Sequence, residues 1–188
     1  MRKPAIKRET KETRISVELD LDGGEVNIST GIGFFDHMLT AFAVHGGFGL
    51  CVETKGDLEV DCHHTVEDTG IVIGKAFSEA LGDKSGIARF GSFYVPMDEA
   101  LGFCSLDISG RPFLVFDAEF PQEQIGSYDS CMTEEFNQII QGIIDKVHKR
   151  IIIVYRQRHQ PWVKIMHQFF EQSNISVLIK KVQCRHIQ

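Results

Sequence analysis

The chain has 188 residues, of which 43% are hydrophobic and 24% charged, a balance that fits a globular domain and argues against disorder. No apolar run reaches the roughly 18 residues that suggest a membrane-spanning helix, and residues 1–13 lack the apolar core of a signal peptide. The five cysteines show no C-x-x-C spacing, which argues against a disulfide framework or a zinc knuckle. We therefore expect a soluble, cytoplasmic protein with no membrane partner.

Charge is unevenly distributed along the chain, although the formal net charge is only −6. Residues 1–136 carry 11 Lys and Arg against 24 Asp and Glu, whereas residues 137–188 carry 9 against 2. A basic tail can attract the phosphates of a nucleic acid. The tail contains no recognisable binding motif, so no nucleic-acid partner is expected.

The first third of the chain shows several strand patterns. Residues 12–20 alternate between apolar and polar side chains, which predicts a strand. Turn residues follow at 22–24, and residues 25–30 form a second strand pattern, so the sequence predicts a hairpin. Residues 50–56 and 58–61 are expected to form short strands.

Two helices are predicted in the same region. The first covers residues 34–45 and ends at Gly46-Gly47, and its apolar side carries Phe35, Met38, Leu39 and Phe42. The second runs from about residue 62 to 81, with Asp61 as its N-cap and Gly82 at its end. Its buried side is expected to include Ile71, Ala76, Phe77, Ala80 and Leu81.

Residues 89–118 return to β structure, and a further helix is predicted from near Ser130. Within the tail, Ile151–Tyr155 is a candidate strand. Runs of strands, instead of strict strand–helix alternation, favour an α+β fold in which helices cover one face of mostly antiparallel sheets.

The strongest chemical signal is the motif His63-His64-x-x-Glu67 near the start of the second predicted helix. Adjacent helical residues project about 100° apart, so the two histidines cannot easily share one ion. Glu67 lies one turn further on, next to both. The pattern predicts two metal sites, each receiving one histidine and completed from elsewhere, and imidazole with carboxylate suits Mn, Fe, Zn, Co or Ni.

The position of this motif at a helix start carries two further expectations. The positive end of the helix dipole disfavours imidazolium, so both histidines should stay neutral and able to bind metal. Asp61 or Asp68 should accept a hydrogen bond from one ring and fix its tautomer. The alternative is a polar helix start with two surface histidines, which a short motif alone does not exclude.

The preceding helix carries two more histidines. His37 and His45 are eight residues apart, a little over two turns, so they share one helix face. A lone His37 on an apolar helix would more often be a core residue. Four of the chain's eight histidines fall on two consecutive predicted helices, however, and this favours metal binding.

With these motifs in view, the sequence closely resembles the imidazoleglycerol-phosphate dehydratase family over residues 8–136. The stretches that carry the resemblance are RETKET (8–13), TGIGFFDHMLTAFAVH (30–45), GDLEVDCHHTVEDTGIVIG (56–74), ARFGSFYVPMDEAL (88–101), DISGRPFLVF (107–116) and SYDSCMTEEF (127–136). The combination of DHML, HHTVEDTGI and PMDEAL is specific to that family.

The resemblance implies dehydration of D-erythro-imidazoleglycerol phosphate to imidazole acetol phosphate in histidine biosynthesis, with two Mn²⁺ ions per site. It implies that the metal ligands are His37, His63, His64 and Glu67. It also implies catalytic roles for Glu12, His45 and Glu67, and a grip on the substrate phosphate by Arg89 and Arg111. Arginine suits phosphate because its planar fork donates two hydrogen bonds together. From the residues alone, both arginines would more often be surface ion-pair residues.

The family fold implied by the resemblance is a duplication of two β-rich halves, each with its own HHxxE helix. The resemblance also implies that subunits assemble into a 24-mer whose metal sites lie between subunits. We accordingly expect one domain over residues 1–188, with half-repeats at 1–85 and 86–188.

The second half-repeat is expected to be atypical or incomplete, because the resemblance to the family ends at residue 136. Residues 137–188 contain no alanine, one glycine and no second HHxxE motif. One hypothesis is out-of-frame translation, and heavy divergence or recombination are others. The alternative function is therefore a metal-binding pseudo-enzyme or shell protein that lacks activity.

Overall fold

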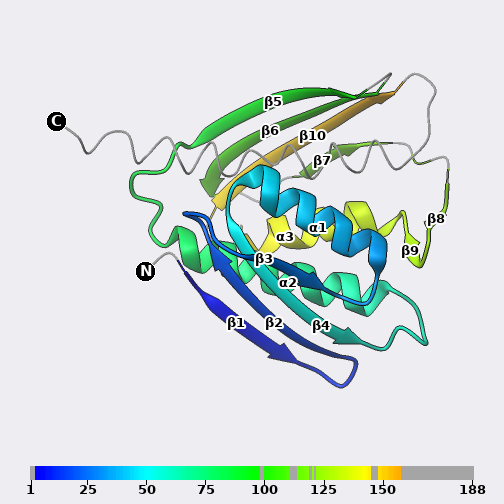
Figure 1. Cartoon of the computed structure of the whole chain (residues 1–188). Helices are drawn as coiled ribbons and strands as arrows, with labels where there is room; N and C mark the ends of the chain where they lie inside the picture. The colour runs from blue at the N-terminus through cyan, green and yellow to red at the C-terminus, as the bar shows by residue number, and fades with distance from the viewer. Residues whose placement is uncertain are drawn as a thin grey trace.

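The computed structural model describes residues 3–97, 100–110, 114–118, 120, 122–144 and 148–157. Two four-stranded sheets lie on either side of three helices (Figure 1). A small third sheet pairs β8 (Gln124–Ile125) with β9 (Tyr128–Asp129). No helix in these ranges is both long and apolar enough to cross a membrane.

The first sheet contains β1 (Ala5–Glu9), β2 (Thr13–Asp20), β3 (Val26–Ser29) and β4 (Gly49–Gly56), in the order β1-β2-β4-β3. β1, β2 and β4 pair in antiparallel fashion, while β3 is parallel to β4. The hairpin in this sheet is therefore β1–β2, and a strand at residues 5–9 was not among the sequence predictions.

The predicted hairpin between residues 12–20 and 25–30 is wrong, because β4 lies between these strands. Gly23 and Gly24 adopt φ angles of 109° and 153°, and they carry the chain across the start of β4 instead of reversing it. The crossing is close: a Cβ at Gly49 would lie 2.9 Å from the Gly24 Cα.

The three helices are α1 (Gly33–Gly46), α2 (His63–Leu81) and α3 (Met132–Ile144), and all three were predicted. Gly47 ends α1 with φ 67°, a left-handed conformation that glycine adopts without strain. Cys62, not Asp61, is the N-cap of α2, but the Asp61 carboxylate still accepts the His63 backbone N–H at 2.7 Å.

Two smaller sequence predictions are also corrected. The expected strand at 58–61 is a turn, in which the Val60 N–H donates to the Asp57 carbonyl at 2.8 Å and both Leu58 and Val60 are exposed. On α2, Ile71 is only half-buried, and Val72 and Ile73 fill the core instead.

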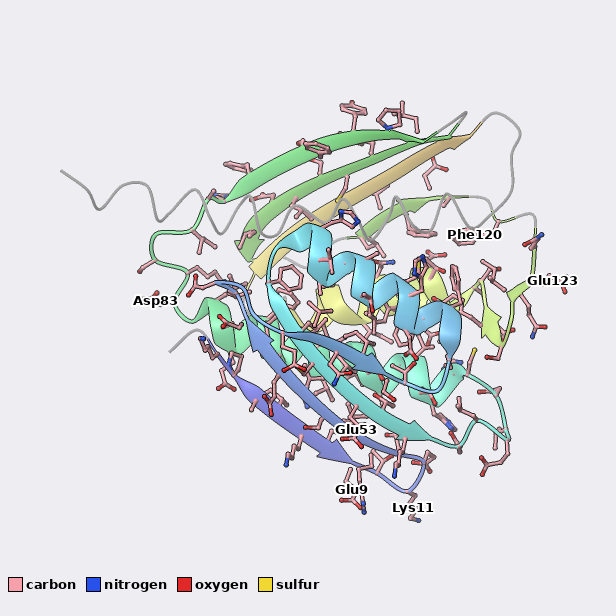
Figure 2. All side chains as sticks on the ribbon, in the orientation of Figure 1. Glu9, Lys11, Glu53, Asp83, Phe120 and Glu123 are labelled. Atoms are coloured by element: carbon pink, nitrogen blue, oxygen red, sulfur yellow. The ribbon has the colours of Figure 1, made fainter. Side chains whose placement is uncertain are left out.

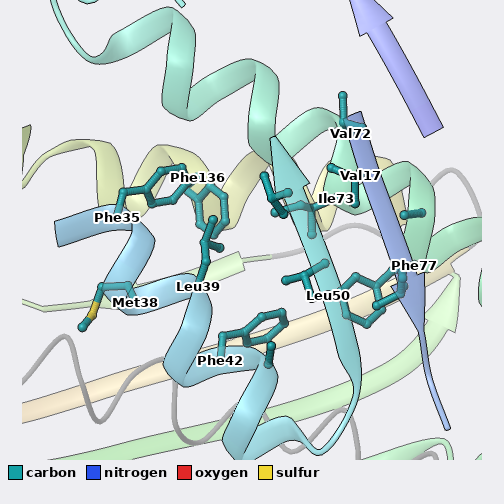
Figure 3. Close-up of a cluster of buried hydrophobic side chains, with 14 of the residues drawn as sticks. Val17, Phe35, Met38, Leu39, Phe42, Leu50, Val72, Ile73, Phe77 and Phe136 are labelled. Atoms are coloured by element: carbon teal, nitrogen blue, oxygen red, sulfur yellow. The ribbon is translucent and has the colours of Figure 1, made fainter. Parts of the chain in front are cut away.

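The hydrophobic core lies between the first sheet and the helices (Figure 3). Phe35 on α1 meets Phe136 on α3 edge to face, with ring centroids 5.2 Å apart. Phe77 on α2 makes similar contacts with Phe42 and Phe48 at 5.9 and 5.4 Å. Aromatic packing therefore fixes the helices relative to one another.

The second sheet contains β5 (Phe90–Met97), β6 (Ala100–Gly110), β7 (Leu114–Asp117) and β10 (His148–Gln157), in the order β5-β6-β10-β7. β10 is antiparallel to β6 and parallel to β7, as β4 is to β2 and β3. Both sheets thus have the same order and directions, and the α+β class with mostly antiparallel sheets is confirmed. The half-repeat boundaries at 85 and 86 stay a prediction.

Replacing Phe77 by alanine should remove a fully buried ring and leave a cavity among Phe42, Phe48 and the first sheet. We expect the free energy of unfolding to fall by about 3–5 kcal/mol, measured by urea denaturation. Val60→Ala, at a side chain that is 66% exposed, is the control and should change it by less than about 0.5 kcal/mol. Equal losses in the two variants would contradict this placement of the core.

Candidate metal and catalytic site

The His63-His64 pair occupies the first turn of α2, next to the turn that follows β4. Their ring centroids are 6.1 Å apart and the ring planes are inclined by 80°. The rings are thus nearly perpendicular, and they diverge toward different carboxylates, as expected for neighbours on a helix.

His63 faces two carboxylates. Its Nε2 lies 3.7 Å from Glu67 Oε2, one turn further along α2, and 3.3 Å from Glu135 Oε1 on α3. Glu135 was not predicted as a site residue. The sequence could predict that Glu135 lies in the first turn of α3. It could not predict that Glu135 lies beside His63, because this depends on the packing of α3 along α2.

His64 has a different partner, Asp57, at the end of β4. The distance between His64 Nδ1 and Asp57 Oδ2 is 2.9 Å. The hydrogen bond to Asp57 raises the pKa of His64 above its usual 6.5, and the charges of Asp57, Glu12 and Asp61 act in the same direction. This direction is opposite to the one expected from the helix dipole, because the Asp57 carboxylate is in direct contact with the ring.

Asp57 also takes the place that the sequence assigned to Asp61 or Asp68 as the carboxylate partner of a ring. Its second oxygen, Oδ1, is buried and has no hydrogen-bond partner within the described residues. The sequence could have suggested Asp57 as the carboxylate partner of a ring, because it lies only six residues before the histidine pair. A turn over residues 58–60 brings it back to His64.

Asp68 instead connects α2 to the edge of the first sheet. It accepts hydrogen bonds from the Thr13 hydroxyl and from Arg8, whose Nε lies 2.9 Å and whose second guanidinium nitrogen lies 2.8 Å from Oδ1. Thr10 in turn accepts the backbone N–H groups of Thr13 and Glu12, at 2.9 and 3.2 Å. This network holds the β1–β2 turn, with Glu12 on it, beside the start of α2.

His37 and His45 are both exposed on α1. The neighbouring Asp36 accepts the backbone N–H and hydroxyl of Thr30, which fixes the start of the helix. Within the described part of the chain, no three His, Cys, Asp or Glu side chains already form a group that could hold a metal ion. The structure therefore does not bring the α1 histidines into a ready-made cluster with those of α2.

Arg89 forms a two-bond ion pair with Asp107, at 2.7 Å from Nε to Oδ1 and 3.3 Å between the second pair of atoms. Its guanidinium also lies 4.8 Å from the centre of the Phe90 ring. The hydrogen bond to this carboxylate raises the pKa of Arg89. Arg111 lies outside the described residues.

The family model described as imidazoleglycerol-phosphate dehydratase matches residues 30–160. The chain belongs to this family. The match continues past residue 136 and includes β10, the strand that completes the second sheet.

The chain is also similar in sequence to individual proteins named imidazoleglycerol-phosphate dehydratase. The chain is 57% identical over 141 residues to the protein from Lacticaseibacillus casei, covering 74% of this chain and 73% of that one. Against the Lactiplantibacillus plantarum protein, identity is 51% over 162 residues, with 85% and 84% covered.

Solved structures of this family have the same fold. The dehydratase from Staphylococcus aureus superposes with a TM-score of 0.77 at 33% identity, covering 92% of this chain and 96% of that one. The Pyrococcus furiosus enzyme in complex with (S)-C348 superposes with a TM-score of 0.74 at 31% identity, covering 93% of this chain and 92% of that one.

The family is metal-dependent, and the chemistry of the residues at the start of α2 fits a transition-metal ion. Two imidazoles and a carboxylate within one helical turn supply nitrogen and oxygen donors of intermediate softness. A complete group of three such side chains does not occur among the described residues, so further ligands would have to come from elsewhere.

In the metal-free protein, the pKa of His64 should lie above 6.5 and fall back toward it in Asp57→Asn. A raised pKa means that the protonated form is favoured by folding, so this contact contributes full stability below about pH 6.5 and loses it as the pH rises through the raised value. Histidine NMR titration measures both values. Identical titration of the two proteins would show that Asp57 does not act on His64.

Proposed function

We propose that the chain catalyses the dehydration of D-erythro-imidazoleglycerol phosphate to imidazole acetol phosphate in histidine biosynthesis, in the cytoplasm. The observation that carries this proposal is the His63-His64-x-x-Glu67 turn of α2, with carboxylates next to both rings, in a chain of this family. No finding favours the alternative of an inactive shell protein.

We propose Mn²⁺ as the metal, two ions per site, with ligands His37, His63, His64 and Glu67. The divergence of the two α2 rings supports separate ions for His63 and His64. A Lewis acid bound to the substrate's ring nitrogens would stabilise negative charge in the ring while hydroxide leaves. A second copy of the chain would supply further ligands, as in the 24-mer that the resemblance implies.

The residues around the metal positions have complementary tasks. The proton to be removed lies on a carbon next to the ring, so a carboxylate or imidazole must stand within hydrogen-bond reach of it. Glu12 is the proposed acid–base residue, because it is exposed on a turn that Thr10 and Asp68 hold beside His64. Glu67 and His45 are proposed to orient the leaving hydroxyl and the ring.

Arg89 and Arg111 are proposed to bind the substrate phosphate. Arg89 already holds a carboxylate, Asp107, with two hydrogen bonds, which is the geometry that a phosphate would use. The substrate would have to compete with Asp107 for this guanidinium or bind to its outer side.

His64→Ala should abolish formation of imidazole acetol phosphate by the Mn²⁺-loaded protein, since it removes a proposed ligand and the partner of Asp57. We expect kcat/KM to fall by at least roughly 100-fold, by analogy with the cost of losing groups that hold a metal. Lys75→Ala, at an exposed position of the same helix, is the matched control. Full activity in His64→Ala would refute the assignment, and an inactive wild-type chain that binds Mn²⁺ would support the pseudo-enzyme.

Arg89→Ala should raise KM for the phosphate substrate by roughly 10- to 100-fold, the value of a lost charge-assisted hydrogen bond. Steady-state kinetics measure it. Arg14→Ala is the control, because Arg14 also forms an exposed ion pair, at 2.8 Å, with Glu9 at the end of β1 (Figure 2). The phosphate role is wrong if both variants keep the wild-type KM.

A further inference from the structure

The contact between Asp57 and His64 has a consequence for metal binding. We infer that Asp57 is a positioning residue, which holds the His64 ring by Nδ1 and so presents Nε2 to the metal ion. The inference rests on the proposed function, because that proposal makes His64 a metal ligand. The contact between Asp57 and His64 does not depend on that proposal. Nothing in the sequence motif assigns Asp57 a role, because the motif begins six residues later.

The backbone holds Asp57 firmly at this place. The preceding residue, Gly56, packs directly against the Thr65 side chain, and a Cβ at Gly56 would collide with the Thr65 hydroxyl. The end of β4 therefore abuts the first turn of α2. The Asp57 carbonyl then accepts the Val60 N–H at 2.8 Å, which turns the chain away and leaves the carboxylate directed at His64.

The carboxylate is used for one contact. Its side chain is only 18% exposed, and its single hydrogen bond among the described residues goes to His64. Neither the buried Oδ1 nor the nearby buried Thr65 hydroxyl oxygen has a hydrogen-bond partner within the part of the chain that the structure describes. Native proteins rarely leave a buried polar atom unsatisfied, so a carboxylate kept here at such a cost points to a task beyond folding.

The task follows from imidazole chemistry. A neutral ring carries its proton on one nitrogen and a lone pair on the other, and the hydrogen bond decides which. With Nδ1–H donating to Asp57, the lone pair lies on Nε2, the nitrogen on the far side of the ring. His63 differs, because its carboxylate neighbours Glu67 and Glu135 lie near Nε2. Of the two histidines at the start of α2, it is therefore His64 whose Nδ1 is held by a carboxylate, which leaves Nε2 free to bind a metal ion.

The test uses the full chain with Asp57→Ala and Asp57→Asn. In metal-free protein at a pH where His64 is neutral, nitrogen NMR should show the Nδ1–H tautomer for the wild type. Asp57→Ala should lose that tautomer, and the affinity for Mn²⁺ alone should fall by roughly 10- to 100-fold, the usual effect of removing a group that orients a metal ligand. Asp57→Asn, whose amide oxygen can still accept the hydrogen bond, should keep the tautomer and much of the affinity.

Glu59→Gln is the charge-matched control, because Glu59 is an exposed carboxylate on the same turn. It should leave both tautomer and affinity unchanged. Unchanged tautomer and affinity in Asp57→Ala would overturn the inference, as would equal losses in Glu59→Gln. If Asp57→Ala fails to fold, the wild-type tautomer decides, because the Nε2–H tautomer in the wild type would overturn the inference. A wild-type chain that shows the Nδ1–H tautomer and binds Mn²⁺ but forms no product would defeat the proposed function and leave the positioning role standing, whereas a wild-type chain that binds no Mn²⁺ would overturn both.

Discussion

Asp68 is a buried carboxylate on α2 that binds Arg8 and Thr13 on the first two strands. A buried charge is tolerated only when it is paired and hydrogen-bonded, and here the Arg8 guanidinium and the Thr13 hydroxyl supply both. Removing one partner would leave the other group desolvated and unpaired, which is far more costly than losing a surface ion pair. The strands and the helix are therefore bound to each other at the point where the candidate site begins.

The site depends on that connection because its groups come from separate elements. Glu12 lies on the β1–β2 turn, Asp57 at the end of β4, the histidine pair on α2 and Glu135 on α3. α2 packs against the first sheet and α3, and so is common to all of them. The aromatic contacts of Phe77 and Phe136 fix the helices from the core side, and Asp68 fixes the outer end.

The sequence predicted the elements better than their pairing. The spacing of Phe35, Met38, Leu39 and Phe42 identified α1, because a helix face follows from local periodicity. The partner of β2 could not be found in this way, because the turn residues at 22–24 fit a hairpin equally well. The pairing of β2 and β3 with β4, and the close approach of Gly24 to Gly49, are features of the tertiary structure. In the site, the divergence of His63 and His64 followed from helix geometry. Their partners Glu135 and Asp57 required tertiary packing and a turn that the sequence had assigned as a strand.

The second sheet shows that a strand places weaker requirements on the sequence than a metal site does. β10 lies between β6 and β7, as β4 lies between β2 and β3, although its sequence belongs to the compositionally distinct tail. Ile151, Ile152, Ile153 and Val154 are strong strand formers, and a central strand needs little more than such residues over sufficient length. A metal site needs particular donor atoms at particular positions. A change in the sequence of the tail that kept apolar, β-branched residues at 151–154 would therefore preserve β10, even if it removed an HHxxE motif elsewhere in the tail. The family fold and a tail without an HHxxE motif thus coexist in one chain.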